Sequence, residues 1–156
     1  MGVCKGLYGR NITVWGNNAG RYTQQKFEAE SEADQKAIIQ FLRNLPLNFD
    51  VTVGGKDYKL VHAVPVELFG RIYSRYYDLE TFAVWHRIEP EDNVQFEKPV
   101  IFGHTPTMYY QDANPMEIWH GDGWTGIDCG CAYDGRLACL RLDDMAEFYS
   151  ASVTEG

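Results

Sequence analysis

The sequence lacks any apolar run near the roughly 18 residues that a membrane-spanning helix needs. Its first residues, M-G-V-C-K-G, also lack the apolar segment of a secretory signal peptide. Gly6 stands where a myristoylation motif requires Ser or Thr, so that lipid anchor is not expected either. We therefore expect a cytoplasmic protein with no membrane partner.

Positive charge is scarce. Lys and Arg total 14 residues against 22 Asp and Glu, which gives a formal net charge of -8. Such a surface repels a polyphosphate backbone, because nucleic-acid binding depends on phosphate neutralisation by basic side chains. The composition therefore predicts no nucleic-acid partner.

Cysteine is also rare, with four residues in the chain: Cys4, Cys129, Cys131 and Cys139. They are too few for a dense disulfide framework and do not form the paired C-x-x-C spacing of a zinc array. We expect reduced thiols. The C-x-C spacing near residue 130 leaves a zinc site as the weaker alternative, and Asp128 is the better candidate for a polar neighbour of a site.

Internal repeats, low-complexity segments and Pro/Gly/Ser-rich linkers are absent from the 156 residues, of which 45% are hydrophobic. Residues 1–156 are therefore expected to form a single domain.

Hydrophobic spacing predicts secondary structure along most of the chain. Residues 23–45 have helical spacing and end at Pro46, residues 49–62 alternate as a β-hairpin, and residues 79–87 form a second helix. A continuous apolar run at 99–102 is typical of a buried strand. Further short strands are expected at 116–119, 124–128, 136–142 and 147–150. This order favours an α/β fold, bordering on α+β, with a mixed sheet.

Two histidines, His62 and His104, end predicted strands. Sites in open α/β sheets gather at the carboxyl ends of strands, and Gly103 and Pro106 would present the second imidazole on a rigid loop. This placement suits metal ligands. The alternative is that each imidazole only makes a backbone hydrogen bond. Two imidazoles alone are too few for a catalytic ion, which requires three or more protein ligands.

Two other residues are candidates for binding an anion. Arg87 follows a predicted helix and could bind phosphate with two parallel hydrogen bonds, or it could merely interact with the helix dipole. Tyr133 lies in a Gly-rich loop and could offer its phenol to an anion or simply anchor the turn.

Several blocks follow one another in the order of a known family's motifs. They are W-G-N-N-A-G-R-Y-T at 15–23, L-R-N-L-P-L at 42–47, Y-K-L-V-H-A at 58–63, V-W-H-R at 84–87, V-I-F-G-H-T-P at 100–106 and I-D-C-G-C-A-Y-D-G-R-L-A-C-L-R-L at 127–142.

From Trp15 to Leu142 these blocks resemble the C-terminal half of bacterial-type phosphoprotein phosphatases, which are calcineurin-like metallophosphoesterases. The sharpest match is to the family's V-x-G-H-T-P motif. The resemblance implies the C-terminal portion of that family's sandwich, in which helices flank mixed β-sheets.

The resemblance also implies roles for residues. His62 and His104 would bind one ion of a two-metal site, with manganese the first choice and iron or zinc possible. Arg87 would contact phosphate oxygens, and Tyr133 would lie beside the site. The implied reaction is hydrolysis of phosphoserine or phosphothreonine by metal-activated water, without a phosphoenzyme. Its substrate would be a phosphoprotein or a small phosphoester.

The differences from the family's motifs are as informative as the matches. The blocks G-D-x-H-G, G-D-x-x-D-R-G and G-N-H-E, which supply the other metal ligands, do not precede Trp15. We therefore expect an incomplete domain, with weak ion binding, little hydrolysis by itself, and an exposed sheet edge that favours self-association. Val64 also replaces the glycine of the family's H-A-G motif, so we expect a different local turn.

Two alternatives to a protein phosphatase stay open at this point. A dinucleoside tetraphosphatase or another small phosphoester hydrolase of the superfamily shares the same ligand types. A noncatalytic module that uses the phosphatase half-fold for binding is the other alternative.

Overall fold

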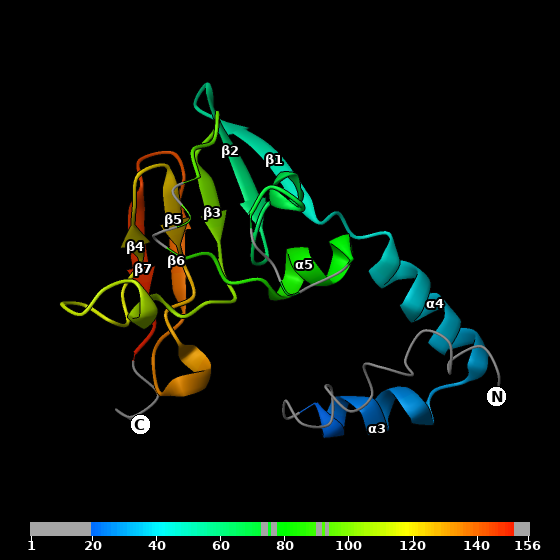
Figure 1. Ribbon diagram of the computed structural model, residues 1–156. Coiled ribbons are helices and arrows are strands. Elements are labelled where there is room, and N and C mark those ends of the chain that lie inside the picture. The colour runs from blue at the N-terminus through cyan, green and yellow to red at the C-terminus, as the bar shows by residue number, and fades with distance from the viewer. Residues whose placement is uncertain (1–19, 73–74, 76–77, 90–91, 93, 152–156) are drawn as a thin grey trace. The chain divides into compact units, whose positions relative to one another are not determined.

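The computed structural model (Figure 1) describes residues 20–72, 75, 78–89, 92 and 94–151. The chain divides into two compact units, residues 1–45 and residues 46–156. Each unit is described by itself below. The first five residues of the W-G-N-N-A-G-R-Y-T block lie outside the described residues.

The first unit contains two helices where the sequence predicted one. Helix α3 spans Arg21–Ala29 and helix α4 spans Glu32–Arg43. The single-helix prediction is wrong because Ser31 adopts an extended conformation and its hydroxyl accepts a hydrogen bond from the Asp34 amide, which begins a new helix. No helix in the described part of the chain is long and apolar enough to cross a membrane.

The second unit is built on a five-stranded mixed sheet, ordered β1-β2-β3-β5-β4. The three inner strands run parallel, and each outer strand is antiparallel to its neighbour. The strands are β1 Asn48–Val53, β2 Lys56–Val61, β3 Val100–Phe102, β4 Trp119–His120 and β5 Trp124–Gly126. The predicted hairpin is confirmed, and its turn uses Gly54 and Gly55, both with positive φ.

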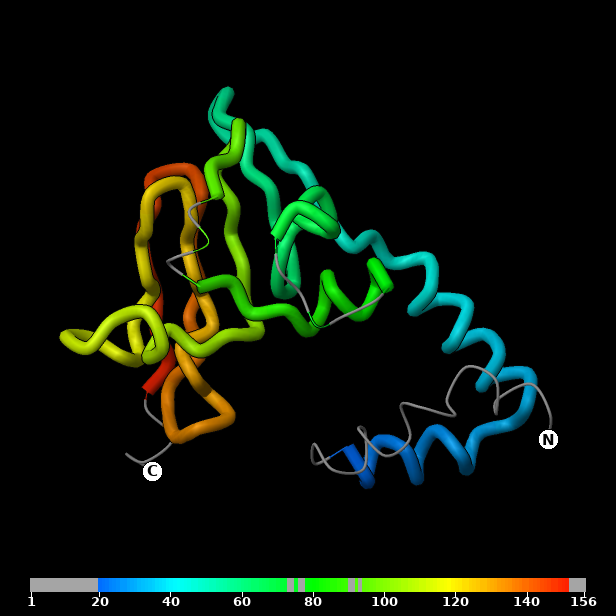
Figure 2. Tube along the Cα trace, viewed as in Figure 1, coloured from blue at the N-terminus to red at the C-terminus, as the bar shows by residue number. Residues whose placement is uncertain are grey.

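The last two strands form a hairpin separate from the five-stranded sheet. Strands β6 Ala138–Arg141 and β7 Ala146–Tyr149 pair antiparallel. The Cα trace in Figure 2 runs through this hairpin in orange and red. The hairpin is joined to the main sheet by polar contacts: Glu147 Oε1 lies 2.6 Å from His120 Nε2, and the Tyr149 hydroxyl accepts a hydrogen bond from the Ile118 amide.

Helix α5, Leu79–Trp85, confirms the second predicted helix, although it ends two residues earlier than expected. Asp78 caps its N-terminus by accepting a hydrogen bond from the Thr81 amide. Its residues Phe82 and Ala83 are buried. His86 then adopts an extended conformation, which ends the helix and carries the chain away from it.

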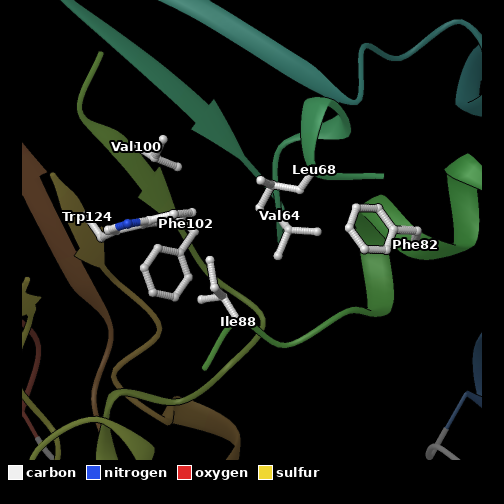
Figure 3. Packing of buried hydrophobic residues seen from close by; sticks show 7 residues of the cluster. All are labelled: Val64, Leu68, Phe82, Ile88, Val100, Phe102 and Trp124. Atoms are coloured by element: carbon white, nitrogen blue, oxygen red, sulfur yellow. The ribbon is translucent and has the colours of Figure 1, made fainter. Parts of the chain in front are cut away.

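The core of the second unit lies where α5 and the segment after β2 meet the sheet. Figure 3 shows its members: Val64, Leu68, Phe82, Ile88, Val100, Phe102 and Trp124. All three residues of β3 are buried, as expected for a strand covered on both faces. Val64, which stands where the H-A-G motif of the phosphatases that the sequence resembles has glycine, is fully buried in this core, and its branched side chain packs against neighbours.

We predict that Phe102→Ala lowers the free energy of unfolding by about 3 to 5 kcal/mol, because it leaves a cavity in the central strand. Phe49→Ala is the matched control, since Phe49 lies on β1 with 55% of its surface exposed. Urea unfolding monitored by circular dichroism measures both. Equal loss in the two variants would contradict the packing described here.

Candidate functional site at the carboxyl edge of the parallel strands

The three parallel strands end at the same level. Val61 at the end of β2 pairs with Phe102, and Phe102 pairs in turn with Gly126 at the end of β5. The residues that leave this edge are therefore neighbours in space, although they lie far apart in the sequence. His62 follows β2 directly, while His104 and Asp128 follow β3 and β5 by two residues.

The structure brings the two predicted histidines together. The ring centroids of His62 and His104 lie 5.1 Å apart, with an angle of 50° between the ring planes. The backbone fixes this pair, because the Gly103 amide donates a hydrogen bond of 3.0 Å to the His62 carbonyl. Both histidines lie just beyond the ends of strands, as the sequence predicted, and their role as metal ligands stays a prediction.

His104 has a positive φ of 64°, a backbone conformation that few residues other than glycine adopt. The chain turns here between β3 and a buried segment in which Thr105 and Thr107 are 4% and 0% exposed. Residues held in strained backbone conformations of this kind cluster at functional sites.

Trp85 and Arg87, at the end of helix α5 and just beyond it, form one side of the site. Trp85, the last residue of α5, places its ring edge-on to His104 with centroids 5.6 Å apart. The exposed Arg87 holds its guanidinium 5.4 Å from the centre of the Tyr109 ring. The guanidinium is therefore oriented by an aromatic face, and it is not placed as a simple helix-end cation.

The surroundings keep the His104 imidazole neutral. Burial lowers its pKa, and the electrostatic effects of the neighbouring His62 ring and the Arg87 guanidinium lower it further. A hydrogen bond to the Trp85 backbone and the charge of Asp128 act in the opposite direction. A neutral imidazole can accept a proton or bind a metal ion.

Asp128 is the third polar residue at this edge. Its carboxylate Oδ1 accepts a hydrogen bond of 3.1 Å from the Gly130 amide, and its carbonyl accepts one of 2.8 Å from the buried Thr107. The sequence indicated Asp128 only as a polar neighbour. Its place beside His104 depends on the strand pairing. The sequence signal for it was the Ile-Asp pair at the end of a predicted strand, which indicates a position at the edge of the sheet.

Tyr133 and Cys131 lie on the turn that follows Asp128, while Cys139 lies in β6. Tyr133 ends a short 3-10 helix, Cys131–Tyr133, and 64% of its surface is exposed. The structure records no contact between Tyr133 and the histidine pair in the described segments, so its role stays a prediction. Cys129, Cys131 and Cys139 are free thiols, as expected.

The donors available for a metal ion are few. Among the described residues, no group of three or more His, Cys, Asp or Glu side chains could hold an ion. The site therefore offers two imidazoles close enough to share one ion, an arginine, and a carboxylate engaged with the backbone. Such a site can bind an ion or an anion weakly and lacks the ligands of a complete catalytic centre.

Comparison with known proteins gives no relative. No family model matches the chain, and no curated protein matches its sequence. Any assignment of function therefore depends on the geometry above and on the short motifs.

We predict that His104→Gly is more stable than His104→Ala by about 1 kcal/mol. Both variants lose the same ring, so the difference isolates the cost of a positive φ at this position. Urea unfolding of both proteins measures it. Equal stability, or a more stable alanine variant, would show that the left-handed conformation is absent in solution.

Proposed function

We propose that this chain is the C-terminal part of a metal-dependent serine/threonine protein phosphatase with a calcineurin-like metallophosphoesterase fold. One observation carries the proposal: His62 and His104 leave adjacent parallel strands with ring centroids 5.1 Å apart. These are the two residues that the resemblance makes ligands of one ion.

The chemistry of the pair suits a divalent ion. Zinc–imidazole bonds are about 2.0 to 2.1 Å long, so two rings at this separation can bind one ion between them. His104 is held neutral, which is the form that ligates metals. Manganese, iron and zinc all accept imidazole ligands. When bound, such ions would supply an activated water and positive charge beside a phosphoryl group.

Arg87 is the residue that would bind substrate. Its guanidinium is exposed and near enough to His104 to lower that residue's pKa. A planar guanidinium can bind two phosphate oxygens at once and orient a phosphomonoester against the two metal ions. The stack on Tyr109 limits the conformations of the arginine before substrate arrives.

The remaining ligands must come from residues other than those described. A two-metal centre needs carboxylates; Asp128 is the carboxylate identified at this strand edge, and no group of three or more ligating side chains is found among the described residues. The resemblance places the missing ligands in three further motifs. By itself, the chain would therefore bind ions weakly and hydrolyse phosphoesters slowly.

The coding DNA provides the first test. Reading in frame upstream of the Met1 codon, we expect the blocks G-D-x-H-G, G-D-x-x-D-R-G and G-N-H-E. Finding them, followed by manganese-dependent turnover of a phosphopeptide by the longer protein, would support the proposal. Their absence would contradict it and favour a noncatalytic module, while faster turnover of dinucleoside tetraphosphate would favour a small-phosphoester hydrolase.

A second prediction concerns the 156-residue chain itself. We expect His62→Asn and His104→Asn each to weaken manganese binding by about tenfold or more, because each removes one of two imidazole ligands. His120→Asn is the matched control, since His120 contacts Glu147 on the hairpin. Isothermal titration calorimetry measures the affinities. Unchanged binding in the first two variants would refute the ligand assignment.

A further inference from the structure

A second feature of the sheet unit is unrelated to the histidine pair. It is a cavity of about 210 Å³ whose walls include Tyr110, Trp119 and Trp124, and whose lining includes the carboxylates of Glu89 and Asp122. This volume is below the roughly 300 to 1,000 Å³ of typical small-molecule sites. It suits the end of a single side chain better than a cofactor.

The aromatic walls are held rigid by their own contacts. Tyr110 and Trp119 stack with centroids 4.7 Å apart and an angle of 24° between their planes. The Tyr110 hydroxyl donates to the Ile88 carbonyl, and Trp124 Nε1 donates to the Val94 carbonyl. Because these polar atoms already have partners, what the rings can offer a ligand is their carbon atoms and π electrons.

The charge around the cavity is negative. Glu89 and Asp122 are both exposed, and none of the described residues that line the cavity is basic. Neither carboxylate is paired with a lysine or arginine within the described part of the chain. Burial raises the pKa of Tyr110 to about 12; the charges of Glu89 and Asp92 act in the same direction, and a hydrogen bond with Thr105 and the charge of Arg87 oppose them.

We propose that this cavity binds the guanidinium of an arginine side chain presented by a peptide partner. Aromatic faces attract cations, and carboxylates at the rim can accept hydrogen bonds from the same group. Arginine fits better than lysine, because the flat guanidinium stacks on a ring while its edge meets a carboxylate. The net charge of -8 would steer a basic peptide toward the chain.

The inference goes beyond the proposed phosphatase function and does not depend on it. None of the five residues that carry it is one of the proposed metal or phosphate ligands. Loss of metal binding would leave it unaffected, and loss of arginine binding would leave the metal proposal unaffected.

Titration of the full 156-residue chain, followed by tryptophan fluorescence, tests the proposal. The probes are the peptide acetyl-Gly-Gly-Arg-Gly-Gly-amide, the same peptide with neutral citrulline in place of arginine, and free agmatine. We expect saturable binding of the arginine peptide, and binding at least about tenfold weaker for the citrulline peptide. No saturable binding, or equal affinity for the citrulline peptide, would overturn the proposal. Agmatine binding as tightly as the arginine peptide would overturn the assignment to a peptide partner.

Variants locate the site. Glu89→Gln and Asp122→Asn should each weaken binding of the arginine peptide by about tenfold, and both positions are exposed, so the fold should be retained. Asp143→Asn is the matched control, because it removes the same charge from an exposed position between β6 and β7. Equal affinity in all three variants would contradict binding at this cavity.

Discussion

The parallel pairing of β2, β3 and β5 is the interaction on which the rest of the second unit depends. It sets Val61, Phe102 and Gly126 at one level, so the residues that follow these strands leave the sheet together. A one-residue shift in this register would exchange the two faces of β3 and place its buried side chains differently. The burial of all three β3 residues stabilises the observed register.

The turns beyond these strands are tightly specified. The Gly103 amide donates a hydrogen bond to the His62 carbonyl, which holds the two turns together. His104 adopts a positive φ, which orients its ring toward His62 and Trp85. A glycine would adopt this backbone conformation with less strain, so the histidine side chain is retained at some cost in stability. That cost is the physical reason to look for a function at this position.

The extended segment after α5 connects two regions of opposite charge. Arg87 stacks on Tyr109 beside the histidine pair, while the Ile88 carbonyl receives the Tyr110 hydroxyl and Glu89 lines the aromatic cavity. One short segment thus places a cation near the proposed phosphate site and a carboxylate at the cavity proposed for a guanidinium.

Local features of the fold could be predicted from the sequence. Alternating residues around Gly54 and Gly55 predicted the β1-β2 hairpin, an apolar run predicted β3, and histidines at strand ends predicted two of the site residues, because these signals depend on near neighbours. The break at Ser31 is also local, because its hydroxyl caps the helix through Asp34, three residues on, but the helical spacing on both sides concealed it. The remaining features depend on tertiary contacts. The 5.1 Å separation of His62 and His104 required the strand register, and the cavity required Glu89, Tyr110 and Asp122 to meet across the fold. These features depend on which distant residues are buried against one another, and burial of that kind has no signature within a short stretch of sequence.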